Sequence, residues 1–266
     1  MKKFACCGML LLVFVLQTFC CSAQYTDSSG YAVAVHDSAA PVIKWNEQRK
    51  RFFPYKSYLF PAALVAYGIV SLHTDALQDV NETVKQEIFT EHNPRKTTLD
   101  NYLQYSPAVA VYALNLAGVH GVHRFCDRTM IYALSTVITS VAVQSGKRIS
   151  AETRPDGTSL GFPSGHTATA FAAAEFLRRE YTNVSPWYGI GGYAAAVVTG
   201  YLRIQNNKHW MGDVVAGAGV GILSTKLAYW VYPAIKRKLF KDKEVTTIVM
   251  PMYRDGAFGL GLSHQF

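Results

Sequence analysis

Stretches of uncharged, mostly apolar residues alternate along this chain with polar segments. Five of them are candidates for helices: residues 57–74, 107–122, 129–146, 182–202 and 214–235, the last interrupted by Lys226. Each is about long enough to cross the hydrocarbon core of a bilayer, although several are at the short end. Their content is Ala, Gly, Val and Tyr more than Leu and Phe. The mean hydropathy of +0.08 therefore does not separate a membrane protein from a soluble one.

Other segments add further elements. Residues 75–99 are charged and helical in character, and residues 167–178 are an Ala-rich run that follows a good N-cap residue, Ser164. In the last apolar stretch, Gly217 and Gly221 are four residues apart, a spacing that suits close contact between two helices.

The C-terminal residues follow a different pattern. Residues 245–253 and 257–266 are rich in β-branched and alternating residues and flank Arg254-Asp255-Gly256, which is typical of a β-hairpin. Two strands cannot close a barrel. We therefore expect an all-α bundle of about six helices with a short hairpin packed on it.

The first residues predict a secretory signal. Lys2 and Lys3 form a charged start, residues 9–19 are apolar, and cleavage is expected after Ala23 because the preceding residues are small. An uncleaved membrane anchor remains the alternative. The predicted organisation is a signal peptide at 1–23, a polar arm at 24–57, a helical domain at 58–240 and the hairpin at 245–266.

The net charge and the cysteine content indicate which ligands and cross-links to expect. The chain has 26 Lys and Arg against 18 Asp and Glu, and without Lys2 and Lys3 the net charge is 24 − 18 = +6. This modest excess suits the neighbourhood of anionic lipid, and no basic groove with interleaved aromatic residues points to nucleic acid. Four of the five cysteines fall in the signal, so Cys126 alone remains. We expect no internal disulfide, no metal and no cofactor.

Three short clusters in the second half of the chain suit phosphate chemistry. They are Lys147 with Arg154-Pro155, then Pro163-Ser164-Gly165-His166, then Arg203 with His209 and Asp213. Arginine presents a planar fork that matches phosphate oxygens, and lysine supplies a point charge. The unpaired amides of the helix after Ser164 suit an anion, and Gly165 lets the backbone approach it. On a helix, His209 and Asp213 would share a face, so the carboxylate could fix the imidazole tautomer.

Together these clusters resemble one known family. The order is Lys-(six residues)-Arg-Pro, Pro-Ser-Gly-His, and Arg-(five)-His-(three)-Asp, within a resemblance that covers about residues 100–232. This pattern is similar to the type 2 phosphatidic acid phosphatase superfamily, which also contains bacterial class A acid phosphatases and vanadium haloperoxidases. One position departs from it, because the family often has Ser where this chain has Leu202.

The resemblance implies a role for each cluster residue. His209 would be the nucleophile that forms a phosphohistidine, Asp213 would orient it, and His166 would protonate the leaving oxygen and then assist water. The phosphate would be held by Lys147, Arg154, Ser164, Gly165 and Arg203. No metal is needed in this scheme, because three basic side chains stabilise the charge of the transition state.

We therefore expect a metal-independent phosphatase acting on lipid phosphates in a bacterial envelope. Candidate substrates are phosphatidic acid, phosphatidylglycerol phosphate, undecaprenyl pyrophosphate and the phosphates of lipid A. The alternatives are a soluble, broad-range periplasmic acid phosphatase, a haloperoxidase, and a non-catalytic membrane or binding protein that keeps the fold. The intact His166, His209 and Asp213 argue against the last of these.

The expected orientation follows from the basic residues. Arg178-Arg179 and Lys236-Arg237-Lys238 would be cytoplasmic by the positive-inside tendency, so the site would face the periplasm. The same counting of basic residues places the start of the 58–74 helix on the cytoplasmic side, whereas a cleaved signal leaves residue 24 on the outer side. These two expectations conflict in the sequence.

Overall fold

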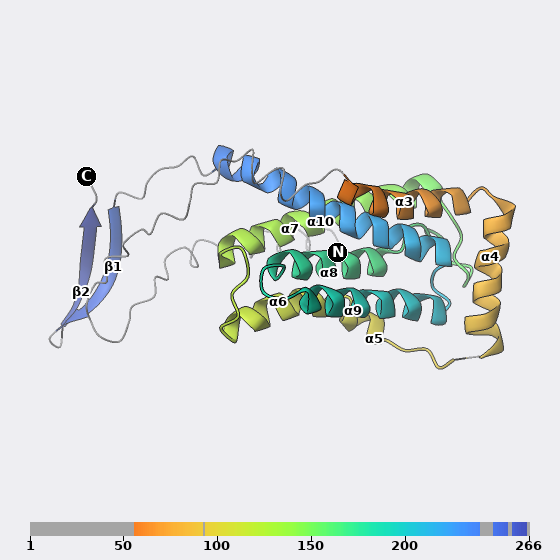
Figure 1. Cartoon of the computed structure of the whole chain (residues 1–266), viewed down its shortest axis with the longest axis horizontal. Coiled ribbons are helices and arrows are strands. Elements are labelled where there is room, and N and C mark those ends of the chain that lie inside the picture. The colour runs from red at the N-terminus through yellow and green to blue at the C-terminus, as the bar shows by residue number, and fades with distance from the viewer. Residues whose placement is uncertain (1–55, 93, 240–246, 255–256, 265–266) are drawn as a thin grey trace, which may run out of the picture.

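The computed structural model describes residues 56–92, 94–239, 247–254 and 257–264. The predicted signal and nearly all of the polar arm lie outside these residues. The described chain forms eight α-helices, one short π-helix and two strands (Figure 1). They are α3 (Lys56–Ser71), α4 (Asp75–Lys85), η1 (Gln86–Glu91), α5 (Leu99–Leu103), α6 (Ser106–Leu116), α7 (Phe125–Ser150), α8 (Gly165–Glu180), α9 (Pro186–Gln205), α10 (Met211–Leu239), β1 (Thr247–Arg254) and β2 (Ala257–His264).

The predicted helical bundle is confirmed. The five apolar stretches become α3, α6, α7, α9 and α10, and the Ala-rich run after Ser164 becomes α8. The charged segment at 75–99 is only partly helical, because helix ends at Glu91 and resumes at Leu99. Pro94 explains this break, since proline lacks a backbone N–H and disfavours helix at the preceding residue.

The stretch at 107–122 forms a shorter helix than its composition suggests. α6 has 11 residues, or about 16 Å of rise, against the ~30 Å core of a bilayer. Helix α6 ends at Leu116, and Gly118 follows in the left-handed region at φ 87°. The helix formed by this stretch is therefore shorter than a bilayer core is thick, although the stretch itself is about long enough to cross one.

One described helix, Met211–Lys238, is long and apolar enough to cross a membrane by itself. α3 followed by α4 and η1 would make a second span only as a broken one, bent by 95°. The apolar window of the Met211–Lys238 helix is 61% buried inside the bundle. Buried apolar helices also form the cores of soluble proteins, so the length and composition of this helix suit either environment.

Helix α8 lies in the middle of the bundle, against α10, α9, α7 and α6 (Figure 1). Its fully buried apolar side chains are small, except for one phenylalanine: Ala168, Ala170, Ala173, Ala174 and Phe176. Such a surface lets α10 approach closely. A Cβ at Gly217 would stand 2.6 Å from the carbonyl oxygen of Ser164, and one at Gly221 would stand 2.8 Å from the backbone nitrogen of Ala172. The close helix contact predicted for this glycine pair is confirmed.

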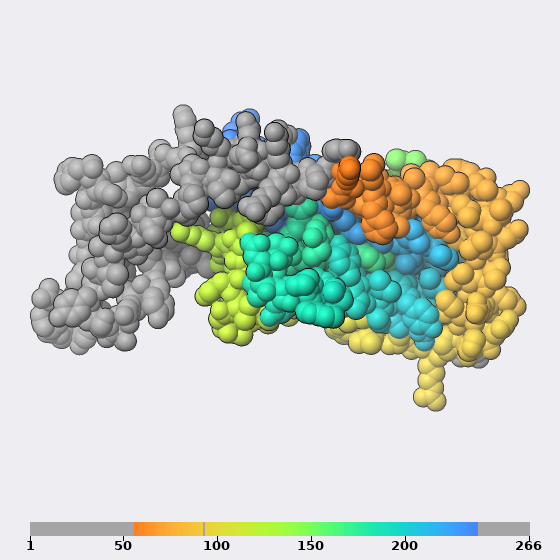
Figure 2. Space-filling model, in the orientation of Figure 1, coloured from red at the N-terminus to blue at the C-terminus, as the bar shows by residue number. Residues whose placement is uncertain are grey.

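Helix α4 lies across one end of the bundle (Figures 1 and 2). The Asn81 side-chain oxygen accepts a hydrogen bond from the Gly212 N–H at 3.0 Å. The Lys85 ammonium lies 4.8 Å from the ring centroid of Trp210. α4 is thus attached to the residues around the start of α10, where His209 and Asp213 are located.

Basic residues at the other end of α8 and α10 have acidic partners. The buried Glu175 carboxylate lies 2.7 Å from Arg178 and 2.8 Å from Arg179, and Lys236 lies 2.8 Å from Asp127. Charges paired in this way attract anionic lipid less than free ones. The periplasmic orientation therefore stays a prediction.

The predicted C-terminal hairpin is confirmed. β1 and β2 pair antiparallel, with Thr247 opposite His264 and Arg254 opposite Ala257. Its predicted packing on the helices stays a prediction, since no such packing is seen among the described contacts.

Candidate active site

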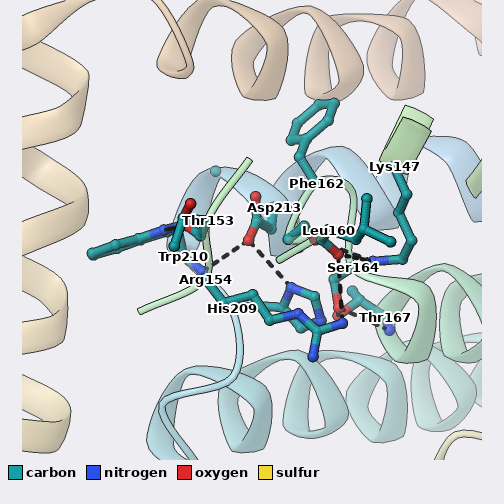
Figure 3. Close-up of polar contacts among 12 residues, drawn as sticks. Lys147, Thr153, Arg154, Leu160, Phe162, Ser164, Thr167, His209, Trp210 and Asp213 are labelled. Carbon is teal, nitrogen blue, oxygen red and sulfur yellow. Dashed lines mark hydrogen bonds and ion pairs between the residues drawn. The ribbon is translucent and has the colours of Figure 1, made fainter. Parts of the chain in front are cut away.

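The three sequence clusters meet at one end of the bundle. The end of α7, the loop 151–164, the start of α8, the end of α9 and the start of α10 all reach this end (Figures 1 and 3). The Ser164 N–H donates to the Asp213 carbonyl oxygen at 3.0 Å, which ties the second cluster to the third. The predicted assembly of Lys147, Ser164 and His209 at one end is therefore seen in the structure.

His209 and Asp213 form a buried pair. The His209 Nδ1 lies 3.2 Å from the Asp213 Oδ2, and the Trp210 N–H donates to the same oxygen at 3.0 Å (Figure 3). His209 is 3% exposed and Asp213 is 1% exposed. Because Nδ1 faces the carboxylate, Nε2 is the ring nitrogen left for another partner.

The pair is not made along a helix face, as the spacing suggested. His209 lies before α10, which begins at Met211, and only Asp213 is helical. Asn207 adopts a left-handed conformation at φ 57°, which turns the chain between α9 and α10. The contact therefore joins a residue of the turn before α10 to a residue in the first turn of α10.

The pKa of His209 is lowered. Burial is the main cause, the hydrogen bond with Asp213 opposes it, and Arg203 and Lys147 add to the lowering. A lowered pKa keeps the imidazole neutral, so that its free nitrogen has a lone pair for nucleophilic attack.

Ser164 is the N-cap of α8, as predicted. Its side chain accepts from the Thr167 N–H, and the two hydroxyl oxygens lie 2.9 Å apart (Figure 3). Ser164 is fully buried. The next residues, Gly165 and His166, begin the helix, where backbone N–H groups lack helical partners and favour an anion.

His166 faces a partner that the sequence did not suggest. Its Nε2 lies 2.9 Å from the Asn101 side-chain oxygen. The His166 pKa is lowered to about 4, mainly by burial and next by the Arg203 charge, and Asp100 opposes this lowering. His166 is therefore neutral in the free site. A phosphate dianion beside it would raise the pKa, because it would offset the positive charge that disfavours protonation.

The three predicted cations surround the same region. Lys147 donates to the Leu160 carbonyl oxygen at 2.6 Å (Figure 3), and Arg203 pairs with Asp100 at 2.5 Å. The Nε groups of Arg154 and Arg203 are buried and have no acceptor within the described part of the chain. A buried donor without an acceptor costs free energy, about 1–3 kcal/mol and more for a charged group. An anion such as phosphate would satisfy both groups.

Sequence reasoning missed Glu152, which faces Asp213. Oxygen atoms of both carboxyl groups, the Glu152 Oε2 and the Asp213 Oδ1, are buried and lack a donor among the described residues. Burial and the Asp213 carboxylate raise the Glu152 pKa to about 9. Glu152 is therefore a neutral acid at pH 7 that can donate to Asp213. The side chain lies two positions before Arg154, but no feature of the sequence distinguishes it from a surface glutamate.

The described residues contain no group of three or more His, Cys, Asp or Glu side chains arranged to hold a metal ion. The cationic groups that line the site come instead from α7, α9 and the loop between α7 and α8. They suit an anion.

The charge on Lys147 leads to a pH prediction. Burial lowers the Lys147 pKa to about 8, and the Arg154 charge is the second cause. The side chain is charged below that pH and loses its charge as the pH rises through it. We expect the Michaelis constant for a phosphate ester to rise on the alkaline side, and this rise to move to higher pH in Lys147→Arg, because arginine stays charged. Michaelis constants measured against pH check this.

Lys208 provides a matched control for that experiment. Its ammonium is paired with Asp156 at 2.8 Å. The Lys208→Arg variant should keep the wild-type pH profile. An alkaline rise at the same pH in Lys147→Arg as in the wild type would contradict the role given to Lys147.

The fold and the site together define a class of protein: a helical bundle with a histidine–carboxylate pair and unsatisfied cationic donors beside a helix N-terminus. Residues 128–237 match the PAP2 superfamily. The matched segment holds the three motifs, in agreement with their resemblance to the type 2 phosphatidic acid phosphatases.

Curated relatives include lipid A phosphatases. The chain is 38% identical over 177 residues to a lipid A 1-phosphatase of Porphyromonas gingivalis, covering 63% of this chain and 40% of that protein. It is 33% identical over 89 residues to a lipid A 4′-phosphatase of Bacteroides thetaiotaomicron, covering 34% of this chain and 39% of that protein. The matches thus span well under two thirds of these relatives.

Two solved structures are also similar. A transmembrane PAP2-type phosphatidylglycerolphosphate phosphatase from Bacillus subtilis superposes with a TM-score of 0.48 at 22% identity, covering 67% of this chain and 98% of that one. LpxE from Aquifex aeolicus superposes with a TM-score of 0.44 at 23% identity, covering 57% and 95%.

Proposed function

We propose that this chain is a metal-independent phosphatase that removes phosphate from a lipid of the bacterial envelope. The observation that carries the proposal is the buried His209–Asp213 pair, joined at 3.2 Å, with no hydrogen bond from the described residues to the second ring nitrogen of His209. The match of residues 128–237 to the PAP2 superfamily and the lipid A phosphatases among the relatives support it.

The proposed reaction has two steps. In the first, the His209 Nε2 attacks phosphorus, the bond from phosphorus to the leaving oxygen breaks, and His166 gives that oxygen a proton. In the second, His166 takes a proton from water, the water oxygen attacks phosphorus, and the phosphorus–nitrogen bond breaks. Asp213 holds His209 throughout, and Lys147, Arg154 and Arg203 stabilise the charge on the phosphate oxygens. Positioned acid catalysis contributes about 10²–10⁴-fold to such a rate.

For the substrate, we propose a phosphate of lipid A. Relatives named as lipid A 1-phosphatase and lipid A 4′-phosphatase support this class over the other lipid phosphates. Large apolar side chains are exposed on the outer faces of α3, α7 and α9: Leu59, Phe60, Val137, Val141, Ile190 and Val197. They support a membrane-associated bundle whose site receives the lipid headgroup. We propose that the site faces the periplasm.

Purified protein in detergent tests this proposal. It would be offered lipid A, phosphatidic acid, undecaprenyl pyrophosphate and a water-soluble phosphate ester, with and without a chelator. We expect phosphate release from lipid A that the chelator does not reduce, and mass spectrometry would show which of its phosphates is lost. Release from the soluble ester alone would favour a broad-range acid phosphatase, and loss of activity in chelator would contradict metal independence.

A further inference from the structure

Helix α5 is held beside the site by a two-way clamp. The Thr97 N–H donates to the Asn206 side-chain oxygen at 2.9 Å, and the Asn206 side-chain N–H donates to the Thr97 carbonyl oxygen at 2.8 Å. Asn206 directly follows α9, three residues after Arg203. The clamp therefore fixes the start of α5 against the end of the helix that carries Arg203.

The first contact from α5 to the site is made by Asp100. This residue is 1% exposed, and its Oδ2 lies 2.5 Å from the Arg203 Nη1. The Arg203 Nε is buried and has no acceptor among the described residues. A guanidinium is planar, so a carboxylate that holds one of its nitrogens also sets the direction of the others. Asp100 thereby keeps the Arg203 Nε available for an anion.

The second contact is made by the next residue, Asn101. Its side-chain oxygen lies 2.9 Å from the His166 Nε2. An amide oxygen only accepts hydrogen bonds, so Nε2 carries the proton of this contact. Nδ1 is then the ring nitrogen available to the substrate. Asp100 and Asn101, adjacent residues of α5, thus contact Arg203 and His166, which belong to two different clusters of the site.

We propose that Asp100 and Asn101 are positioning residues of the phosphatase reaction, Asp100 by holding Arg203 for the phosphate and Asn101 by holding His166 so that Nδ1 meets the leaving oxygen. This inference rests on the proposed function. Neither residue needs to touch the substrate. The two contacts predict different kinetic defects, because phosphate binding depends on Arg203 and protonation of the leaving oxygen depends on His166.

Asp100 has a further electrostatic effect on His166. The charged or titratable groups that shift the His166 pKa are Arg203 on α9, Arg154 in the loop after α7, His209 before α10 and Asp100 on α5. The first three lower the His166 pKa and Asp100 raises it. Removing the Asp100 charge should therefore lower the pH at which His166 loses its proton in the substrate complex.

The test compares Asp100→Asn and Asn101→Ala with Tyr102→Ala, a control on the same helix whose side chain is 75% exposed. Asp100→Asn should raise the inhibition constant of orthovanadate and the Michaelis constant about 10–100-fold, the range for a hydrogen bond to a charged group. It should also move the alkaline limb of kcat to lower pH. Asn101→Ala should lower kcat on lipid A about 10-fold or more, with little change on p-nitrophenyl phosphate, whose acidic phenol leaves without a proton.

Tyr102→Ala should match the wild type in every assay. Kinetics of Asp100→Asn and Asn101→Ala equal to those of the control would overturn the inference. So would an equal loss of kcat on both substrates together with a lowered melting temperature, because that would indicate a structural role alone. If the wild type hydrolyses neither substrate, the proposed function fails. Orthovanadate affinity, measured by calorimetry, then still tests whether Asp100 prepares Arg203 for an anion.

Discussion

Replacement of His209 by alanine is expected to lower phosphate release by at least about 10⁴-fold, the loss typical of removing a nucleophile from a catalytic unit. The physical reason is the absence of an alternative attacking group in this geometry. His209 is held by Asp213 at 3.2 Å with one ring nitrogen free, whereas the other site histidine, His166, is bound to Asn101. Rapid-quench experiments with labelled substrate should detect an acid-labile phosphorylated protein in the wild type and none in His209→Ala.

His120 is the matched control for this experiment. It lies in the connection between α6 and α7 and is exposed, and within the described residues its ring forms one side-chain hydrogen bond, with Asn115 at 3.1 Å. His120→Ala should keep full activity. Circular dichroism would show that His209→Ala is folded. A folded His209→Ala variant with wild-type turnover would rule out the phosphohistidine mechanism.

Replacement of Gly221 by alanine is expected to have the largest effect on stability. A Cβ at this position would overlap the Ala168 carbonyl oxygen and stand 2.8 Å from the Ala172 backbone nitrogen. Both atoms belong to the backbone of α8, so they move only if α8 and α10 separate. Overpacking of this kind costs about 1–3 kcal/mol or more. For a chain of this size, 3 kcal/mol corresponds to a melting temperature lowered by roughly 6–12 °C.

Gly191 provides the control in another helix. It is exposed on α9, and a Cβ there would meet no atom within 4 Å. Gly191→Ala should raise stability slightly, by about 0.5–1 kcal/mol, because alanine is the better helix former. Thermal unfolding in the same detergent compares the two variants. Equal melting temperatures for Gly221→Ala and the wild type would mean that α8 and α10 do not pack as closely as described.

Much of this fold was predictable because its signals are local. Each signal favours or ends a helix within a few residues of its own position. Examples are the runs of apolar residues, the N-cap at Ser164 and the proline at 94. The helices therefore appear close to their predicted positions. The length of α6 was not predictable in this way. Residues 117–122 are uncharged like the residues before them, but the helix ends at Leu116.

The orientation argument shows a different limit of the sequence. Arg178 and Arg179 count as two free charges in the sequence, but both are paired with the buried Glu175. Pairing depends on how the side chains of one helix are directed and buried, and a count of residues contains no such information. The positive-inside tendency is therefore a weaker guide here than the number of basic residues suggests.

The sequence by itself determined which side chains could bind and transfer a phosphate, because the three motifs place cations, histidines and a helix N-terminus at helix ends. Only the tertiary structure decided which further residues contact these side chains. Asp100 and Asn101 meet Arg203 and His166 across 103 and 65 positions of the chain, and the pKa of Glu152 is raised because its carboxyl group is half-buried beside Asp213. Contacts between distant segments and the loss of water around a charge arise when the helices pack, so no local pattern contains them.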